Sequence, residues 1–501
     1  MSNLAARFPI QPDDRVALII GERRITYGEL GEMIGSVRGG LAANGLEPGH
    51  RVMMIGGNSE IVLVTYLACL SSGLVTVPIN PLSPPSEMNS EIERCQPHAV
   101  VLDDAGFDAW QRLGPDAQDR VPIVFAPSGP GAPHPLADAP WVPGVEVAAD
   151  EPAVLLFTSG TSGTPLPAIL THHNLAASMD AVLSLGLPLA GHDHVVLAVV
   201  PLFHVFGLNL VVNLGLTIGA TMVLEDHQGP ERTAELAALH EVTVVSGPPT
   251  LWSSLLVSAS VPDDAFDTVQ FAVSGAAPLD PSVARAIGDR FGLMISEGYG
   301  LTETSGLVCS ALGLDTACGS VGRPFPGVEV RLVDEAGGDV LIGDAGEVLV
   351  RGPMVSPGYF GDDAATARTR TDDGWLITGD LAVVDEDGEL SIVGRAKDLI
   401  IVSGFNVHPA EIERVISGHE AVALVAVVAE PDELTGEHPV AHVVLHPGSR
   451  VSETELIDLC HDHLARYKTP KVIVFTNSIP TGLGGKLRRS ALGAASSSGS
   501  T

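Results

Sequence analysis

Basic residues are scarce in this chain. The 501 residues include 27 lysines and arginines against 61 aspartates and glutamates, so the formal net charge is −34 at pH 7. This charge disfavours binding to nucleic acid or to anionic lipid, because both ligands need clustered positive charge. A nucleotide ligand remains compatible with it, since one local site can oppose the global charge.

Cysteines and membrane-spanning patterns are also scarce. The five cysteines are dispersed and lack the spacing of a metal site, so we expect reduced thiols in a cytoplasmic protein. Residues 1–12 lack the basic segment followed by an apolar segment that is typical of a signal sequence. Two long apolar stretches, residues 61–79 and 208–224, are interrupted by small or polar residues. They are typical of buried helices and strands, so we expect no transmembrane segment.

Strand and helix patterns alternate over most of the chain. Residues 14–102 and 153–297 each show short apolar strands between helical segments, which predicts parallel sheets covered on both faces. Residues 127–152 are rich in Pro, Gly and Ala, and we expect them to connect the two units over the surface. Short strands separated by Asp and Gly turns follow from about residue 319.

The expected fold class is therefore α/β. We expect a large N-terminal domain of two α/β sheet subdomains plus a β subdomain, followed by a small mobile α+β C-terminal domain. The predicted boundaries are 1–394 for the N-terminal domain, 395–398 for a hinge, 399–490 for the C-terminal domain and 491–501 for a disordered tail. Hydrophobic residues make up 45% of the chain, which is enough to build large cores.

A loop made only of Thr, Ser and Gly follows the apolar run 153–157. Residues 158–164 offer backbone N–H groups without side-chain bulk, together with several hydroxyl donors. Such a loop can wrap an anionic group with many oxygens, such as a triphosphate. Taken alone, it is equally consistent with a flexible linker.

Nine short motifs, of which this loop is the first, follow one another in a fixed order. The motifs are Thr-Ser-Gly-Thr-Ser-Gly at 158–163, Thr-His-His-Asn at 171–174, Pro-Leu-Phe-His at 201–204, Ser-Gly-Ala-Ala-Pro-Leu at 274–279, Glu-Gly-Tyr-Gly-Leu-Thr-Glu-Thr at 297–304, Gly-Glu-Val-Leu-Val-Arg-Gly at 346–352, Thr-Gly-Asp at 378–380, Gly-Arg-Ala-Lys-Asp at 394–398 and Gly-Lys at 485–486. This order resembles the adenylate-forming superfamily of acyl-CoA synthetases, luciferases and adenylation domains. The resemblance covers about residues 14–490 and implies ATP, Mg²⁺ and coenzyme A as cofactors and cosubstrates.

The resemblance implies a nucleotide site built from these motifs. Tyr299, at the end of a predicted strand, can stack on adenine, although alone it would equally suit a core aromatic. Asp380, expected in a tight turn, can accept bonds from ribose hydroxyls, and Arg395 can bond the same sugar or the phosphate. Alone, these two would be a plain turn residue and a surface ion pair. The implied ATP- and AMP-binding residues are Thr158, Ser159, Gly160, Thr161, Ser162, Gly163, Gly275, Ala276, Ala277, Glu297, Gly298, Tyr299, Gly300, Thr302, Asp380 and Arg395.

Three residues are implied to be catalytic, namely Lys486, His204 and Glu303. Glu303 suits a hard cation such as Mg²⁺, which takes oxygen ligands, although a lone Glu is usually just solvated. By resemblance, Lys486 bridges the substrate carboxylate and the α-phosphate, where a positive charge stabilises the transition state. In similar acyl-CoA and aryl-CoA synthetases, a histidine at the position of His204 flanks the carboxylate pocket; the alternative is a half-buried structural histidine.

Lys397 matches the position of the hinge between the two domains in this superfamily. Rotation of the C-terminal domain about this residue would remove Lys486 from the active site and bring in the face that carries Ser403, Gly404 and Phe405. In similar enzymes this region borders the pantetheine tunnel. A lid that serves two half-reactions fits a hinge at a domain junction.

The expected acyl pocket is mostly apolar. Its predicted lining consists of His204, Val205, Trp252, Gly275, Ala276, Gly300 and Leu301. Domains of the superfamily that activate amino acids place an Asp close to the Pro-Leu-Phe-His motif to pair with the substrate ammonium, and this chain has no Asp there. A carboxylic acid with an acyl or aryl tail is therefore favoured.

The phosphate loop departs from the family at its far end. The family usually continues with Pro-Lys-Gly, whereas this chain has Pro165, Leu166 and Pro167. The lysine whose charge would lie near the β- and γ-phosphates is missing, and Pro167 has no N–H to donate. Mg²⁺, Arg395 or Lys486 could supply the charge, or adenylation is slow, or the site has drifted. We expect weakened pyrophosphate handling, so Leu166→Lys should change the rate of ATP–pyrophosphate exchange.

The leading interpretation is an ATP-dependent acyl-CoA synthetase. It would activate a fatty or aryl acid as acyl-AMP with release of pyrophosphate, and then pass the acyl group to coenzyme A. An acyl-AMP ligase that loads the pantetheine of a carrier protein is one alternative, and a non-catalytic nucleotide- or acyl-binding descendant is another. The expected partners are a small carboxylic acid and coenzyme A or an acyl carrier protein, without nucleic acid, in a monomer or a homodimer.

Overall fold

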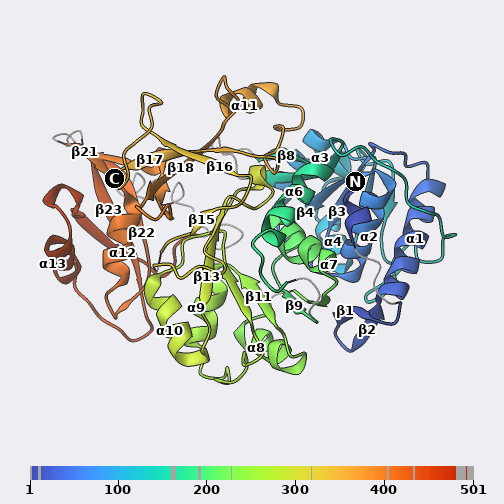
Figure 1. Ribbon diagram of the computed structural model, residues 1–501, viewed down its shortest axis with the longest axis horizontal. Helices are drawn as coiled ribbons and strands as arrows, with labels where there is room; N and C mark the ends of the chain where they lie inside the picture. The colour runs from blue at the N-terminus through green and yellow to red at the C-terminus, as the bar shows by residue number, and fades with distance from the viewer. Residues whose placement is uncertain are drawn as a thin grey trace.

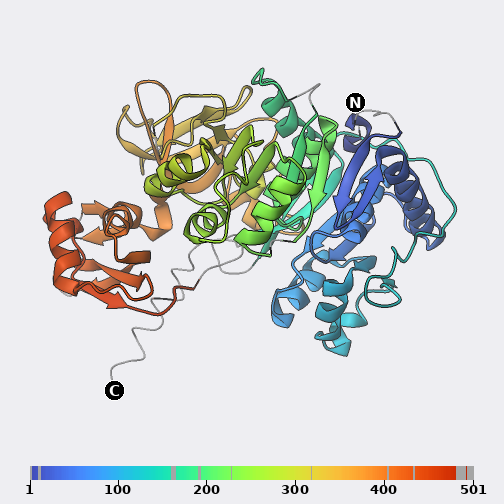
Figure 2. The ribbon, with the colours of Figure 1, turned by 90° about the horizontal axis from the view of Figure 1, so that it is seen from below.

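The computed structural model describes residues 3–8, 13–158, 165–189, 193–226, 228–317, 319–402, 405–432, 435–480 and 492. Two large sheets with helices, a smaller β sheet and a C-terminal lobe make up these residues (Figure 1). The C-terminal lobe, coloured orange to red, lies at one end of the molecule, and the blue N-terminal helices lie at the other (Figure 2). This is the α/β arrangement expected from the sequence.

The first sheet contains six strands. They are β3 (Arg51–Ile55), β4 (Val75–Ile79), β5 (Ala99–Leu102), β6 (Val124–Phe125), β7 (Pro152–Thr158) and β8 (Leu166–Thr171). Their order is β6-β5-β3-β4-β7-β8, and all neighbours are parallel except the antiparallel pair β7–β8. The sequence did not predict β8, which contains Pro167 and lies at the sheet edge, where a missing N–H is tolerated.

The second sheet contains nine strands. They are β1 (Val16–Ile20), β2 (Arg23–Thr26), β9 (Val195–Ala198), β10 (Thr221–Leu224), β11 (Val244–Gly247), β12 (Phe271–Ser274), β13 (Ile295–Tyr299), β14 (Cys309–Ser310) and β15 (Arg323–Pro324). Their order is β15-β14-β13-β12-β11-β9-β10-β1-β2. The hairpin β1–β2 was predicted to open the first unit, but β1 pairs in parallel with β10 of the second. Strand propensity indicates that a strand forms and not which sheet it joins.

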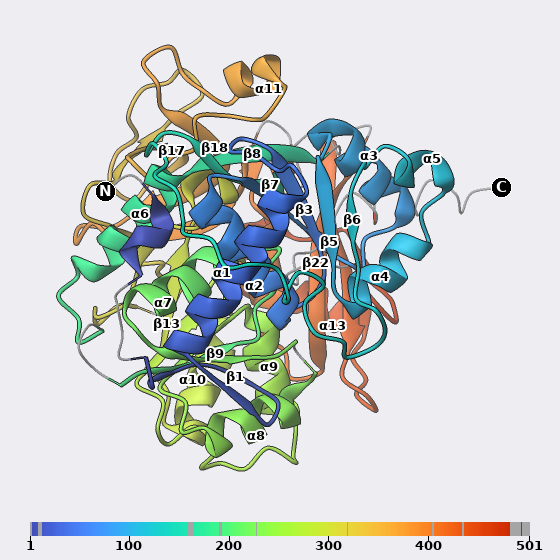
Figure 3. The ribbon, with the colours of Figure 1, turned by 90° about the vertical axis from the view of Figure 1, so that its right-hand side faces the viewer.

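Helices cover both faces of the sheets. They are α1 (Tyr27–Ala43), α2 (Glu60–Ser72), α3 (Pro85–Cys95), α4 (Asp104–Gln111), α5 (Pro115–Gln118), α6 (His172–Leu183), the π-helix η2 (Phe206–Asn213), α7 (Leu214–Thr217), α8 (Pro230–Leu239), α9 (Pro249–Val257) and α10 (Pro281–Phe291). One core contains side chains of both sheets together with α1, α2, α6 and η2 (Figure 3). The sheets are therefore joined by shared helices, and a second core lies under α8, α9 and α10 on the opposite face of the nine-stranded sheet.

A four-stranded antiparallel sheet follows. Its strands are β16 (Glu329–Val333), β17 (Ala345–Arg351), β18 (Leu376–Val384) and β19 (Leu390–Arg395), with α11 (Asp363–Arg368) between β17 and β18. The predicted mainly β segment is therefore present.

The C-terminal lobe is a compact α+β unit. Its elements are β20 (Ile400–Val402), β21 (Phe405–Val407), α12 (Pro409–Ser417), β22 (Val422–Asp432), β23 (Gly436–Leu445), α13 (Glu453–His463) and β24 (Val472–Phe475). The chain passes from β19 to β20 through one short helix, η4 (Ala396–Asp398), and Leu399. The predicted hinge at 395–398 falls on this link. Within the described ranges, no helix is both long and apolar enough to span a bilayer.

Candidate active site

A tyrosine, an aspartate and an arginine from three separate motifs meet at the site. The Tyr299 hydroxyl, at the end of β13, donates to Asp380 Oδ2 at 2.7 Å, and Arg395 Nε lies 2.8 Å from Asp380 Oδ1. The Asp380 side chain is 6% exposed, so both partners approach it away from bulk water. Burial, followed by the charge of Asp380, raises the pKa of Tyr299 well above its usual value. The phenol therefore remains a donor.

Asp380 lies inside a strand and not in the tight turn that the sequence predicted. One residue of β17 faces three residues of β18 between the pairs Glu347–Leu381 and Leu349–Ile377. Gly379, at φ +71°, allows this bulge, because the left-handed region favours glycine. The bulge directs the Asp380 carboxylate toward Tyr299. A Thr-Gly-Asp run is typical of a turn by composition, and only the pairing of the strands shows that it continues a sheet.

The loop after β12 has a strained backbone. Ala276 adopts φ +71°, a left-handed conformation that is uncommon for a residue with a Cβ and is often found at functional sites. A Cβ added to Gly275 would lie 3.5 Å from the Phe206 ring, so this loop approaches η2 closely. Glu297 Oε2 accepts a bond from the Leu279 N–H at 3.2 Å, and burial raises the pKa of Glu297. The buried carboxyl thereby holds the loop against β13.

The glycines after β13 allow two backbone segments to touch. A Cβ on Gly300 would lie 2.2 Å from the Gly306 carbonyl oxygen, so no larger residue fits there. Ser305, in the same turn, adopts φ +54°. The 3-10 helix η3 (Thr302–Thr304) lies between these contacts and carries Glu303.

Glu303 is held from two sides. Its Oε1 accepts a bond from the Tyr359 hydroxyl at 2.7 Å, and its backbone oxygen accepts one from the Ser356 N–H at 2.7 Å. This geometry orients the carboxylate and leaves Oε2 for a cation. Mg²⁺ commonly uses one or two protein carboxylates and completes its shell with phosphate oxygens and water, so Glu303 fits the role expected of it. In the described part of the chain, no three His, Cys, Asp or Glu side chains cluster as a metal site.

The sequence missed two neighbours of Glu303. Tyr359 was not predicted to belong to the site, because it follows a glycine in a segment without a motif. Arg370 donates to the Ser356 backbone oxygen, and its Nη1 is buried without a hydrogen-bond partner. An arginine between a helix and a strand looks like a surface residue in the sequence, and only the fold places it beside Glu303.

His204 and Val205, both expected to line the acyl pocket, directly precede η2. The His204 Nδ1 accepts a bond from the Phe206 N–H at 3.3 Å, so a neutral imidazole carries its proton on Nε2. His204 is half-buried, Val205 is buried, and Leu301 is half-buried.

Trp252 does not belong to the predicted pocket. The side chain is fully buried in the core under α9, together with Leu197 of β9 and Val199, which directly follows this strand. Alternate residues of this strand, Val196 and Ala198, point to the other face of the sheet, where η2 packs. The sheet therefore separates Trp252 from His204, and the indole is a core residue.

Several predicted residues lie outside the described ranges. They are Ser159, Gly160, Thr161, Ser162 and Gly163 of the phosphate loop, Ser403 and Gly404 of the predicted coenzyme A region, and Lys486. Thr158 and Leu166 face each other as the last pair of β7 and β8, so the loop is the connection of a hairpin. Phe405 begins β21, and Lys397 lies in η4.

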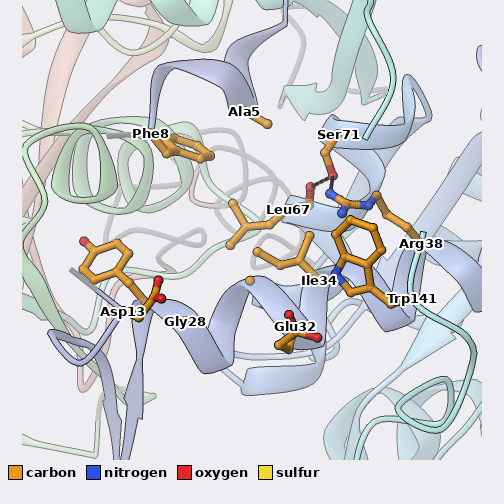
Figure 4. A pocket seen from close by; sticks show the side chains of 12 residues that line it. Ala5, Phe8, Asp13, Gly28, Glu32, Ile34, Arg38, Leu67, Ser71 and Trp141 are labelled. Atoms are coloured by element: carbon orange, nitrogen blue, oxygen red, sulfur yellow. Dashed lines mark hydrogen bonds between the residues drawn. The ribbon is translucent and has the colours of Figure 1, made fainter. Parts of the chain in front are cut away.

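A cavity of about 610 Å³ lies away from these motifs, between α1, α2 and the connecting segment (Figure 4). Arg38 donates to the Ser71 hydroxyl there at 3.1 Å and lies over the Trp141 ring, with 5.7 Å from guanidinium carbon to ring centre. None of the predicted site residues lines this cavity, so it is separate from the site.

Comparisons with known proteins agree with the motifs. Residues 5–360 match the family model of the AMP-binding enzymes, and residues 411–486 match that of the AMP-binding enzyme C-terminal domain. The chain is 33% identical to a feruloyl-CoA synthase of Amycolatopsis sp, with 93% of each protein covered. It is also 33% identical to a long-chain-fatty-acid–CoA ligase of Yersinia pestis, with 89% of this chain and 85% of the ligase covered.

A solved structure is similar over almost the whole chain. ATP-bound MatB from Rhodopseudomonas palustris has a TM-score of 0.92 at 31% identity, with 99% of both chains covered. The apo structure of the same protein has a TM-score of 0.81. Its large N-terminal and small C-terminal domains correspond to those seen here. The chain therefore belongs to the AMP-binding enzyme family, as an AMP-forming acid–CoA ligase.

Proposed function

We propose that this ligase activates a carboxylic acid with an apolar tail, aryl or fatty, and that free coenzyme A is the acceptor. The observation that carries the proposal is the apolar wall along the adenylate motifs. A Cβ on Gly306 would lie 3.2 Å from Leu210 and 3.5 Å from Val205, and one on Gly275 would lie 3.5 Å from Phe206. These side chains offer an aryl or alkyl tail dispersion contacts and no ionic partner.

The relatives support the same substrate class. One is a feruloyl-CoA synthase and another a long-chain-fatty-acid–CoA ligase, so aromatic and aliphatic tails both occur among proteins of equal similarity. The absence of an Asp from residues 203–206 argues against a substrate ammonium, which would need a buried counter-charge.

In the first half-reaction, a carboxylate oxygen of the acid attacks the α-phosphorus of ATP. The P–O bond to the β-phosphate breaks, and acyl-AMP and pyrophosphate form. His204 would donate from Nε2 to the second carboxylate oxygen and orient the nucleophile, since its Nδ1 already accepts from the backbone. Lys486 would stabilise the negative charge that develops between carboxylate and phosphate.

The nucleotide would lie between Tyr299 and the bulge that carries Asp380. The Tyr299 hydroxyl and Arg395 Nε both donate to the Asp380 carboxylate and hold it in one orientation. The remaining lone pairs of this carboxylate can then accept hydrogen bonds from the ribose hydroxyls. Glu303 would hold Mg²⁺, whose charge neutralises the phosphate oxygens when it is bound.

In the second half-reaction, the coenzyme A sulfur attacks the acyl carbon. The bond to the phosphate oxygen breaks, AMP leaves, and the thiol proton passes to solvent or to a base. We propose that the C-terminal lobe rotates about Lys397 between the two steps and brings residues 403–405 to the site. The short link between β19 and β20 supports this hinge.

A carboxylic-acid screen tests the proposal. The purified chain is given Mg·ATP and aryl, fatty, short dicarboxylic and amino acids, with and without coenzyme A, and pyrophosphate release and acyl-CoA are measured. We expect both products with aryl or fatty acids. Activity only with dicarboxylic or amino acids would overturn the substrate class. Acyl-AMP without acyl-CoA would indicate a carrier protein as acceptor, and ATP binding without any product would indicate a binding protein.

A further inference from the structure

Position 166 cannot supply charge to the nucleotide. Leu166 is the first residue of β8, is 9% exposed, and packs with Ala168, Tyr359 and Ala365. Apolar contacts therefore surround the position at which the family usually has a lysine. The missing charge has to come from another element.

Tyr359 connects this apolar cluster to the proposed metal ligand. Its ring packs against Leu166, and its hydroxyl donates to Glu303 Oε1 at 2.7 Å. The far end of the phosphate hairpin and the Glu303 carboxylate are thus separated by a single tyrosine side chain.

Arg370 is the cation next to that tyrosine. It follows α11 and donates to the Ser356 backbone oxygen, while the Ser356 N–H donates to the Glu303 backbone oxygen. One residue, Ser356, therefore links the guanidinium to the Glu303 segment. Arg370 also lies close enough to Tyr359 for an electrostatic interaction between the two side chains.

The Arg370 guanidinium is not fully used by the protein. Its Nη1 is buried and has no hydrogen-bond partner, and no carboxylate of the described residues pairs with it within 4.0 Å. A buried charged donor without a partner is costly. Arg395 differs, because it is paired with Asp380 at 2.8 Å on the ribose side. Arg370 is thus a half-buried arginine with donor capacity left beside Glu303.

We propose that Arg370 supplies the positive charge at the pyrophosphate end of ATP, in place of the lysine that Leu166 replaces. The inference rests on the assignment of Glu303 to the metal–phosphate end of the site. A guanidinium suits this role, since it presents several donors to phosphate oxygens. Burial lowers the pKa of Arg370, but an arginine remains charged under physiological conditions.

Ligands with and without pyrophosphate separate this role from a structural one. Binding of Mg·ATP, magnesium pyrophosphate and AMP is measured by calorimetry for the full chain and for Arg370→Met. We expect affinity for ATP and pyrophosphate to fall by about 10- to 100-fold, as for the loss of a charged hydrogen bond, while AMP binding stays the same. These binding measurements need no acid substrate. They therefore test the role of Arg370 even where the proposed acid is wrong.

Kinetics and matched variants complete the test. Arg370→Met should slow ATP–pyrophosphate exchange but leave thioester formation from preformed acyl adenylate unchanged, because that step involves no pyrophosphate. Arg370→Lys should recover part of the activity, and so should Leu166→Lys added to Arg370→Met. The control is Arg368→Met, on exposed Arg368 two residues away. Equal losses for AMP and ATP, or unchanged ATP and pyrophosphate binding, would overturn the proposal.

Discussion

At the scale of single residues, a buried carboxyl on α3 links stability to pH. Glu91 is 4% exposed, and its Oε2 has no hydrogen-bond partner. Burial, followed by the charge of Glu87, raises the pKa of Glu91 from 4.5 to about 8. The folded protein therefore binds this proton more tightly than the unfolded chain does.

Glu91→Gln should stabilise the protein at alkaline pH and change little at acid pH. The stabilisation from the bound proton is fully present below pH 4.5 and is lost as the pH rises through about 8. Glutamine keeps the shape and cannot ionise, so the variant avoids this loss. Since one pKa unit corresponds to about 1.4 kcal/mol, the shift from 4.5 to about 8 sets an upper bound on the gain of about 5 kcal/mol.

Thermal unfolding midpoints between pH 5 and pH 9 measure this effect. Glu93→Gln is the matched control, because Glu93 lies on the same helix and is exposed. We expect the advantage of Glu91→Gln to grow with pH and that of Glu93→Gln to stay constant. A pH-independent difference for Glu91→Gln would show that the carboxyl is ionised in the folded state throughout.

The place of a residue along its element could be predicted better than the surroundings of its side chain. Tyr299 was expected at a strand end and lies there, and its contact with Asp380 joins two predicted residues. Trp252 was expected in the lining of the acyl pocket, yet it faces the opposite side of the sheet from His204. Arg370 was missed because its role depends on a contact 67 residues away in the chain, with Glu303 across Ser356. Long-range contacts of this kind leave no local pattern.

At the scale of elements, the π-helix η2 connects the apolar wall to the adenylate motifs. Two of its asparagines are fully buried. Asn209 Nδ2 donates to the Ser178 hydroxyl at 2.6 Å and to the Ser305 backbone oxygen at 3.0 Å, while Asn213 Nδ2 donates to the Tyr66 hydroxyl at 2.7 Å. π-helical turns often occur at functional sites. Asn209 here fixes the turn that carries Ser305 at φ +54°.

Asn209→Leu should impair both stability and substrate binding. The change leaves the buried Ser305 carbonyl without this donor, which costs about 1–3 kcal/mol. The turn after Glu303 would then be held less firmly, so the KM values for the acid and for ATP should rise. Tyr66→Phe is the matched variant, because the Tyr66 hydroxyl contacts Asn213 of η2 and not the motif. It should lower the unfolding midpoint with unchanged KM values. Equal effects of the two variants on KM would contradict the assignment.

Element types could be predicted from the sequence, and their partners could not. The apolar strands β3, β5 and β9 and the helices α1 and α6 follow from periodicity and capping residues, such as Thr26 and Thr171. The pairing of β1 with β10 joins segments about 200 residues apart, and no local signal specifies it. The edge strand β8 was missed because Pro167 within it, Pro165 directly before it and its position after a loop argue against a strand.

At the scale of the whole molecule, a short link joins the four-stranded sheet to the C-terminal lobe. The four-stranded sheet ends at Arg395, η4 covers residues 396–398, and the sheet of the C-terminal lobe begins at Ile400. The observed arrangement is more similar to that of ATP-bound MatB, with a TM-score of 0.92, than to that of the apo form, with 0.81. A protein locked in this arrangement should therefore form the adenylate.

Lys397→Pro should separate the two half-reactions. Proline fixes φ near the value of a 3-10 helix, which Lys397 already belongs to in η4, so the variant favours the observed arrangement and resists rotation. We expect ATP–pyrophosphate exchange to remain within about threefold of the unaltered protein and thioester formation to fall at least about tenfold, as for a step limited by a conformational change. Lys397→Ala, which removes the charge and keeps the backbone free, should leave both steps close to normal. Two results would place the hinge elsewhere. One is a parallel loss of both steps in the proline variant, and the other is the same loss of thioester formation in the alanine variant. Neither can come from restricted rotation at residue 397 alone.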